Sequence, residues 1–384
     1  MFKKATTSFN CKVSSLLIAL FSSQTFAAWD DINMTEGVTA ISKEVFELHM
    51  LIFWICVVIG VIVFGVMFYS MFAYTKKKNP NPSTFHENTK VELAWTIVPF
   101  LILVFMAIPA SNTLTTIYDD SAGDINIQVV GYQWKWQYKY LEDEIDFFSN
   151  LTTDLDEIYN KTPKGEHYLE EVDEVVVIPV GKKIRFLITA NDVIHSWWMP
   201  DFAIKQDAIP GFINTAWTVV DKPGTYRGKC TELCGKNHGF MPVVVKAVPQ
   251  DEYDSWVKNK KEEAFKIAEL TEKDWTKEEL FERGEEVYAK NCVACHQTNG
   301  QGIPPVFPAL AGSDIVMNDA SRQIEILMEG VGPTYAMQAF GKQLNEIDIA
   351  AVITYSRNAW SNAENGDGKI VTPKDIVDYK KPKV

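Results

Sequence analysis

The sequence has few basic residues for its length, and histidine and cysteine are scarce. Its 37 lysines and arginines are outnumbered by 50 aspartates and glutamates, which gives a formal net charge of −13 at pH 7. This acidity argues against nucleic acid as a partner and suits basic ones. Six histidines and six cysteines in 384 residues leave few candidates for metal ligands. We find no internal repeat.

Long hydrophobic runs are also scarce, since only two charge-free stretches exceed the roughly 20 residues that cross a bilayer as a helix. They predict helices at about 48–74 and 94–117; a buried core helix is the alternative, which their length disfavours. The short connection between them carries four lysines: Lys76, Lys77, Lys78 and Lys90. Such a loop is expected on the cytoplasmic side. Residues 29–118 are therefore interpreted as an N-terminal segment and a transmembrane hairpin.

The first 28 residues have the pattern of a secretory signal peptide. Three lysines precede a short apolar segment, and small residues at Ala27 and Ala28 offer a cleavage site. The apolar segment is too short to span a bilayer. An unstructured soluble terminus is the alternative.

From about residue 124, short β-branched and aromatic runs alternate with Gly, Pro, Asn and Asp. They predict strands at 125–140, 174–180, 182–189, 215–220, 225–229 and 241–248. Short strands without a long helix between them are typical of a β-sandwich or barrel, here over 119–250. The acid-rich insertion at 141–174 is expected to be an exposed loop or, alternatively, a docking patch for a basic protein.

A helical C-terminal unit is expected after the strands. Residues 251–275 are charge-dense and predict a helical linker, and a capping box of Thr276 and Glu279 then begins a unit over 276–362. Its last helix should start near Asn345. The tail at 363–384 has few apolar residues and is expected to be loose.

The segment "CVACH" at 292–296 has the C-x-x-C-H pattern of haem c attachment. Cys292 and Cys295 would form thioethers to the porphyrin, and His296 would bind the iron. A disulfide or redox motif is the alternative, which the adjacent histidine and the helical surroundings disfavour.

A methionine opposite the histidine would raise the haem potential. Met328 lies in an apolar helical pattern and Met317 in a short helix, so packing explains both. Met337 lies in a glycine-flanked loop without such a pattern. We therefore expect Met337 to be the second axial ligand.

A second cluster of soft or borderline donors lies at 228–242: Cys230, Cys234, His238 and Met241. A disulfide or half of a zinc site would use the cysteines but not the methionine. A blue-copper centre has only one thiolate. Two thiolates and two imidazoles instead suit a pair of copper ions bridged by both sulfurs, and His195 is expected to supply the second imidazole.

Two family resemblances follow from these segments. The region from "RGEEVYAKNCVACH" to "GPTYAMQAF" resembles a class I cytochrome c domain, with Gly284 and Tyr355 where that family's first and last helices cross. The family usually has proline after the axial methionine, where Gln338 stands here. "GYQWKWQY", "NDVIHSWWMPDFAIKQDAIPGFIN" and "PGTYRGKCTELCGKNHGFMPVVV" resemble cytochrome c oxidase subunit II, and the match covers about 40–250. It implies a cupredoxin-like β-sandwich with the binuclear copper centre CuA.

The second resemblance also implies the copper ligands. They would be the side chains of His195, Cys230, Cys234, His238 and Met241, with the backbone carbonyl of Glu232. The Glu232 carboxylate would contact a magnesium ion shared with subunit I.

Other matched positions imply less specific roles. Trp134 matches the aromatic that receives the electron of a docked cytochrome, and Glu92 matches a carboxylate at a proton-channel mouth. An ordinary strand aromatic and an interfacial acid are the alternatives. The family often has tyrosine where Lys135 stands, and many members have arginine where Phe212 stands.

The resulting interpretation is a multidomain membrane protein: a transmembrane hairpin, a cupredoxin-like β-sandwich and an all-α cytochrome c domain. It would be subunit II of a haem–copper oxidase, passing electrons from reduced cytochrome c or another donor through haem c and CuA to the haem of subunit I. Oxygen reduction and proton pumping need subunit I, because this chain lacks the histidines for such a site. Subunits I and III and membrane lipid are the expected partners.

The signal peptide, the hairpin and the fused domain favour a bacterial inner membrane with both redox domains in the periplasm. One alternative is a membrane-anchored electron-transfer or copper-binding module outside an oxidase. Another is the electron-input subunit of a nitrogen-oxide reductase. A quinol oxidase subunit is disfavoured, because the copper ligands are complete.

Overall fold

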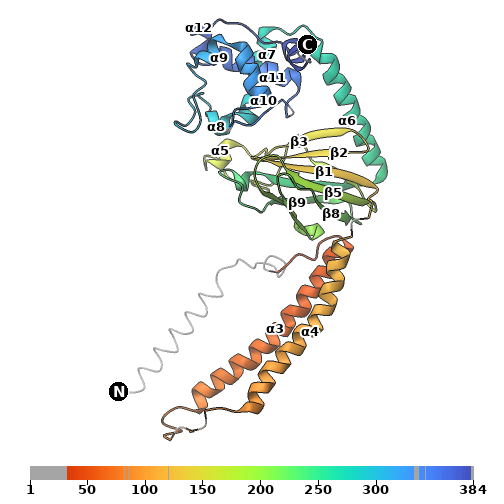
Figure 1. Cartoon of the computed structure of the whole chain (residues 1–384), viewed down its shortest axis with the longest axis vertical. Coiled ribbons are helices and arrows are strands. Elements are labelled where there is room, and N and C mark those ends of the chain that lie inside the picture. Colours follow the sequence, from red (N-terminus) through yellow and green to blue (C-terminus); the bar gives the residue numbers. More distant parts are fainter. Residues whose placement is uncertain are drawn as a thin grey trace.

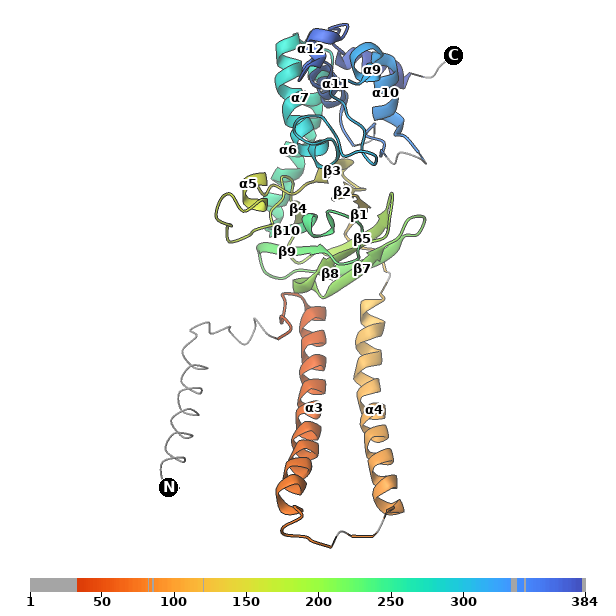
Figure 2. The same ribbon diagram turned by 90° about the vertical axis from the view of Figure 1, so that its left-hand side faces the viewer.

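The computed structural model describes residues 33–81, 83–84, 86–119, 121–332, 337–341 and 343–381. The predicted signal peptide at 1–28 lies outside these residues. Three parts follow one another along the long axis of the molecule: a helical hairpin, a domain of two β-sheets and a helical C-terminal unit (Figures 1 and 2).

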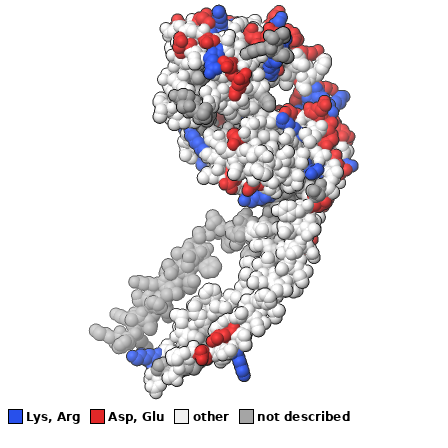
Figure 3. Space-filling model, viewed as in Figure 1, with Lys and Arg blue, Asp and Glu red and all other residues white. Residues whose placement is uncertain are grey.

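The hairpin consists of α3 (Ala40–Ala73) and α4 (Thr89–Ile117), both long and apolar enough to cross a membrane. On the face drawn in Figure 3, no charged side chain is seen along its middle. Both helices begin earlier than the predicted 48–74 and 94–117. Thr39 forms a capping box with Ser42, and Asn88 caps α4. A charge-free run marks the part suited to hydrocarbon, whereas the caps set where a helix begins.

The β-domain has two five-stranded sheets, in the orders β3-β2-β1-β5-β8 and β4-β10-β9-β6-β7. The strands are β1 (Ile125–Tyr132), β2 (Lys135–Tyr140), β3 (Ile145–Ser149), β4 (Val176–Pro179), β5 (Lys183–Ala190), β6 (His195–Met199), β7 (Ile204–Ala208), β8 (Asn214–Val219), β9 (Gly224–Cys230) and β10 (Pro242–Val248). β1 pairs with β2 in antiparallel and with β5 in parallel orientation. The predicted strand at 125–140 is therefore two strands of a hairpin that turns at Gln133 and Trp134.

Three strands, β3, β6 and β7, have no counterpart in the prediction. β6 is buried at four of its five positions, so it lacks the alternation that marks a half-exposed strand. β3 lies inside the acid-rich insertion. That insertion also contains the short helix α5 (Leu155–Ile158). Two acids of the insertion form ion pairs with lysines of α6 (Gln250–Thr271), the helix that follows the last strand: Asp143 with Lys261 and Glu174 with Lys260. The insertion is therefore a structured segment rather than a simple exposed loop.

Aromatic side chains fill the space between the sheets. Trp136, Tyr138, Phe186 and Trp197 are fully buried. Their polar atoms are paired, since the indole of Trp197 donates to the hydroxyl of Tyr138 at 3.2 Å. Truncating one such aromatic to alanine costs about 3–5 kcal/mol. This core fixes the sheet edges from which the metal-binding loops extend.

A long helix, α6 (Gln250–Thr271), connects the β-domain to the C-terminal unit and runs along the outside of the sheets (Figure 1). Its first turns belong to the sandwich core. Tyr253 is buried, and the ring of Trp256 lies 5.0 Å from that of Tyr140. The predicted linker is thus a helix that is anchored at its base.

The C-terminal unit is helical. Its helices are α7 (Lys277–Asn291), α8 (Val293–His296), α9 (Asp314–Asn318), α10 (Ala320–Glu329), α11 (Glu346–Asn358), α12 (Asn362–Asn365) and α13 (Pro373–Lys380). The predicted capping box of Thr276 and Glu279 starts α7. α7 crosses α11 at Gly284, where a Cβ atom would lie 2.1 Å from the backbone oxygen of Ala351. Only glycine permits this approach.

The expected loose tail is wrong for residues 373–380, which form α13. Ile376 and the preceding Val371 are buried in a core cluster with α11. The hydroxyl of Thr354 donates to the Val371 carbonyl at 3.0 Å, and Arg357 donates to the Lys369 carbonyl at 3.2 Å. Two apolar side chains are enough to hold the tail on the cytochrome unit, because polar side chains of α11 form hydrogen bonds with its backbone carbonyls.

Replacing Gly284 with alanine should destabilise the C-terminal unit by about 1–3 kcal/mol, the usual cost of overpacking. Helix propensity alone would favour alanine by about 1 kcal/mol. A decrease in the free energy of unfolding would therefore show that the close contact with α11 outweighs propensity. Calorimetry of the detergent-solubilised chain measures it. Gly332→Ala is the control, because its Cβ would meet no described atom within 4 Å. Equal stability of both variants would contradict the close crossing.

Candidate metal centre and haem-attachment segment

The sheet order brings the predicted copper ligands to one end of the sandwich. Cys230 ends β9, and His195 begins β6, which pairs with β9 through Trp197 and Cys230. Cys234 follows in the loop between β9 and β10. A Cβ atom at Gly131 of β1 would lie 2.7 Å from the His195 ring, so glycine there leaves room for the imidazole.

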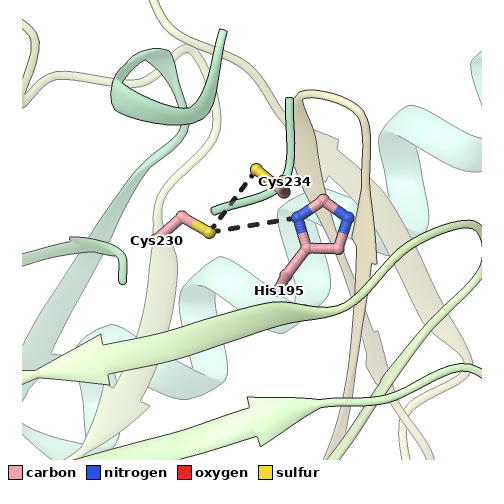
Figure 4. A group of neighbouring side chains, drawn as sticks. All are labelled: His195, Cys230 and Cys234. Carbon is pink, nitrogen blue, oxygen red and sulfur yellow. Dashed lines mark hydrogen bonds between the residues drawn. The ribbon is translucent and has the colours of Figure 1, made fainter. Parts of the chain in front are cut away.

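Two buried thiols lie at the centre of the cluster (Figure 4). The sulfurs of Cys230 and Cys234 are 3.8 Å apart, and both cysteines are free thiols. Nδ1 of His195 lies 3.9 Å from the Cys230 sulfur. The Glu232 carbonyl oxygen lies 3.4 Å from the same sulfur.

The other predicted ligands surround the second sulfur. Nδ1 of His238 lies 3.5 Å from Sγ of Cys234, and Sδ of Met241 lies 3.6 Å from it. The structure therefore brings the six predicted donor atoms together, with four of them around the pair of sulfurs. Such a soft set suits copper, whereas zinc has no use for the thioether. The residues present fit a copper pair, which both thiolates would help to hold.

The protons of the two thiols are coupled. The hydrogen bond from Cys234 lowers the pKa of Cys230, against the effect of burial. The same contact, together with burial, raises the pKa of Cys234. The pair thus loses one proton readily and holds the other, until a cation makes a second thiolate favourable. For His195, burial lowers the pKa, but the bonds to Asp192 and Cys230 outweigh it and the net pKa is raised.

Asp192 orients the His195 ring and is a residue that the sequence interpretation missed. Its Oδ1 lies 2.9 Å from Nε2 of His195, which leaves Nδ1 directed at the sulfurs. Its Oδ2 accepts from the backbone N–H of Gln133 at 2.7 Å. Partners of this kind fix the tautomer of a ligating histidine. Its position three residues before the histidine was the available signal.

The turn at Gln133 and Trp134 packs on the loop between β9 and β10, which carries Cys234 and is called the copper loop below. The side-chain amide of Gln133 donates to the Cys234 carbonyl at 2.8 Å, and the Trp134 indole N–H donates to the same oxygen at 3.2 Å. Trp134 is half-buried. It is thus attached to the backbone of a predicted ligand, a contact that the sequence did not reveal.

In the C-x-x-C-H segment, α8 follows directly on the end of α7. Cys292 and Cys295 are free thiols, and burial raises the pKa of Cys292 to about 12. Nδ1 of the buried His296 lies 3.0 Å from the Pro308 carbonyl, so this nitrogen donates and Nε2 is left as a ligand. Burial lowers the pKa of His296, which favours the neutral, ligating form. These residues fit a covalent haem; Pro308 is a further residue that the sequence interpretation missed.

The methionines occupy different surroundings. The backbone of Met337 pairs with Val331 through hydrogen bonds of 2.9 and 3.1 Å. Met328 packs in a core cluster, and its methyl carbon would lie 2.8 Å from a Cβ at Gly341. Met317 lies on α9 next to the buried Val316. The assignment of Met337 as axial ligand stays a prediction.

The other side chains singled out in the sequence do not join the copper cluster. Glu92 is in the first turn of α4, and about 25 residues of helix, or roughly 37 Å, separate it from the sandwich. Its carboxylate accepts from the Asn88 N–H at 3.3 Å. The side chain of Glu232 is exposed, and Phe212 is 67% exposed.

The fold and the two sites define a membrane-anchored electron-transfer protein, and the comparisons identify its family. Models described as cytochrome c oxidase subunit II match residues 27–112 (transmembrane domain) and 125–248 (periplasmic domain). A model described as cytochrome c oxidase, cbb3-type, subunit III matches residues 279–355.

Named relatives agree with these matches. The chain is 38% identical over 248 residues to a probable cytochrome c oxidase subunit 2 of Rickettsia bellii, covering 63% of this chain and 90% of the relative. It is 37% identical over 232 residues to cytochrome c oxidase subunit 2 of Cyanidium caldarium, covering 60% and 90%. A crystal structure of the periplasmic domain of subunit II of cytochrome oxidase from Bradyrhizobium japonicum aligns with 38% identity and a TM-score of 0.33, covering 37% of this chain and 97% of that one.

The chain belongs to the cytochrome c oxidase subunit II family and carries a C-terminal cytochrome c domain. CuA copper and haem are its cofactors, and its two apolar helices make it a two-pass membrane protein. Its function is electron transfer within an oxygen-reducing oxidase, which confirms the main interpretation of the sequence.

Removing the carboxylate in Asp192→Ala should weaken copper binding by about 10–100-fold, because the partners that orient ligating histidines typically contribute that much. Competition between the purified protein and a copper chelator measures the affinity. Asp221→Ala removes an exposed carboxylate between β8 and β9 and should leave the affinity unchanged. An unaltered affinity in Asp192→Ala would show that the ring needs no such support.

Proposed function

We propose that His195, Cys230, Glu232, Cys234, His238 and Met241 hold the copper pair of this subunit, and that Cys292, Cys295, His296 and Met337 hold its haem. The observation that supports the copper assignment is the convergence of four further donor atoms on two buried sulfurs 3.8 Å apart. A bound copper pair would supply one-electron redox chemistry that is shared between two ions.

The protein's contribution at the copper loop is to fix its ligands before a metal binds. Asp192 sets the orientation of one imidazole, and the Gln133 amide and the Trp134 indole N–H, which both donate to the Cys234 carbonyl, hold the second thiol in place. Burial keeps water from the sulfurs, since Cys230, Cys234 and Met241 are all at most 3% exposed. Ligands held in this way move little when an electron is gained or lost.

Trp134 receives electrons for the copper loop in this proposal. Its half-buried ring ends in an N–H bonded to the carbonyl of a ligand residue. The exposed carboxylate of Glu232 would contact a magnesium ion shared with subunit I. Glu92, at the far end of α4, would lie at the mouth of a proton channel.

In this proposal the subunit lies in a bacterial inner membrane, with its lysine-rich loop in the cytoplasm and both redox domains in the periplasm; the positive charge of the loop supports this orientation. Subunits I and III and membrane lipid surround α3 and α4, whose apolar side chains are exposed. Reduced cytochrome c or another upstream donor supplies electrons. The proposed domains are the copper domain at 119–250, a helical linker at 251–275 and the cytochrome domain from 276; α13 extends this last domain beyond residue 362.

The isolated complex should contain a copper pair and a single covalent haem per copy of this chain. Metal and haem analysis gives the amounts, and electron spin resonance should show one unpaired electron shared by both copper nuclei. Cys234→Ser should abolish that signal, because one bridging sulfur is lost. Cys56→Ser, which changes a cysteine on α3, should leave it intact. A signal confined to one nucleus, or zinc in place of copper, would reject the binuclear site.

Met337→Leu should lower the haem potential and alter the optical spectrum, because methionine ligation raises the potential of a histidine-bound haem. Redox titration of the full chain measures both. Met328→Leu is the matched control, since its side chain packs in the core and should leave both unchanged. If Met328→Leu shifts the potential and Met337→Leu does not, the axial ligand is wrongly assigned.

A further inference from the structure

The cytochrome unit contacts the sandwich at the turn between β1 and β2. Gln338, next to Met337 in the chain, donates from Nε2 to the carbonyl oxygen of Gln133 at 3.4 Å. The side chain of Gln133 donates in turn to the carbonyl of Cys234 at 2.8 Å. Gln133 therefore connects Gln338, the neighbour of Met337, to the copper loop through two hydrogen bonds.

A lysine lies beside this contact. Lys135 begins β2 and is only 6% exposed. Its ammonium donates to Oδ1 of Asn291 at 3.2 Å. It also lies 5.0 Å from the ring centroid of Phe148 and 5.4 Å from that of Phe340. Phe148 belongs to the sandwich, whereas Asn291 and Phe340 belong to the cytochrome unit. Groups from both domains therefore surround the ammonium.

Burial of an ammonium is costly unless other groups replace its water. Burial lowers the pKa of Lys135 to about 8, which reflects that cost. Each cation–π contact with an aromatic ring offsets about 0.5–2 kcal/mol of that cost. Asn291 is also the last residue of α7, so the ammonium lies at the helix end that carries partial negative charge. The compensating groups on the cytochrome unit are available only while the two domains are docked.

Another lysine on the same strand shows how such a side chain behaves without this contact. Lys139 extends to the surface, where its side chain is 36% exposed and pairs with Asp146 at 3.4 Å. Long cationic side chains usually keep their charge in water in this manner. The strand therefore does not by itself require a buried lysine at position 135.

We propose that Lys135 is the positioning residue that holds the cytochrome unit on the turn bearing Trp134, so that the fused domain covers this surface. The proposal rests on the proposed function, because it takes Trp134 and the copper loop as the electron-accepting side. Figure 1 is consistent with this arrangement, since α8 lies on the side of the cytochrome unit that faces the sandwich.

Amine labelling tests the docked state directly on the purified oxidase complex with its cofactors bound. After brief treatment with N-hydroxysuccinimidyl acetate, mass spectrometry quantifies acetylation at Lys135 and Lys139. Lys135 should react at least ten-fold more slowly, a factor that corresponds to about 1.4 kcal/mol. Asn291→Ala, which alters only the cytochrome side, should raise labelling of Lys135 towards that of Lys139. Equal labelling of the two lysines in the unaltered complex would overturn the proposal.

A second experiment compares Lys135→Gln with Lys139→Gln, which makes the same charge change on the same strand away from the interface. Flash photolysis measures electron transfer between the haem and the copper pair. Lys135→Gln should slow it about ten-fold, while the haem spectrum and the copper spin-resonance signal stay unchanged; Lys139→Gln should leave all three unchanged. Asn291→Ala provides the same comparison from the other domain if Lys135→Gln does not assemble.

The outcomes separate this proposal from the function on which it rests. If the unaltered complex has no copper pair, or no transfer between the centres, the proposed function fails. If transfer is fast and Lys135→Gln and Asn291→Ala both match Lys139→Gln, only the role of Lys135 fails.

Discussion

The proximity of two buried thiols is the constraint on which the rest of the β-domain depends. Two thiolates 3.8 Å apart would repel each other by about 4 kcal/mol even at an effective dielectric constant of 20. Without metal the pair therefore keeps a proton, and with metal the bound cations balance both charges. The surroundings must hold this arrangement in either state. Gly131 leaves space for an imidazole, and Asp192 and Gln133 fix the ring and the loop from outside.

The sequence predicted which residues gather at the copper cluster better than it predicted the strands and hydrogen bonds around them. Donor type and spacing predicted five of the copper ligands, the haem cysteines and His296, because a metal restricts which residues can serve, and the family resemblance added the Glu232 carbonyl. It did not reveal β6, whose run of buried residues lacks a strand's alternation, or the packing of α13, which depends on polar groups of α11. Asp192, Gln133 and Pro308 were also missed, since hydrogen bonds between distant segments leave no local pattern.

Two positions where the sequence departs from its families' usual residues lie in one interface. Gln338 stands where the cytochrome family usually has proline, and Lys135 where the subunit II family often has tyrosine. Proline has no N–H or side-chain donor, so it could not make the bond from Gln338 to Gln133. Tyrosine has no positive charge to place between Phe148 and Phe340. Both departures therefore fit a chain whose cytochrome partner is covalently attached.

The anchoring of α6 has a consequence for how such a fusion can change during evolution. Its base is part of the sandwich core through Tyr253 and Trp256. The length of the helix therefore sets the rotation and the height of the cytochrome unit relative to the sandwich. Each added or deleted residue would turn the attached domain by about 100° and shift it by about 1.5 Å. The number of residues in the helix is thus tightly constrained, whereas the identity of its outward-facing side chains is free to drift.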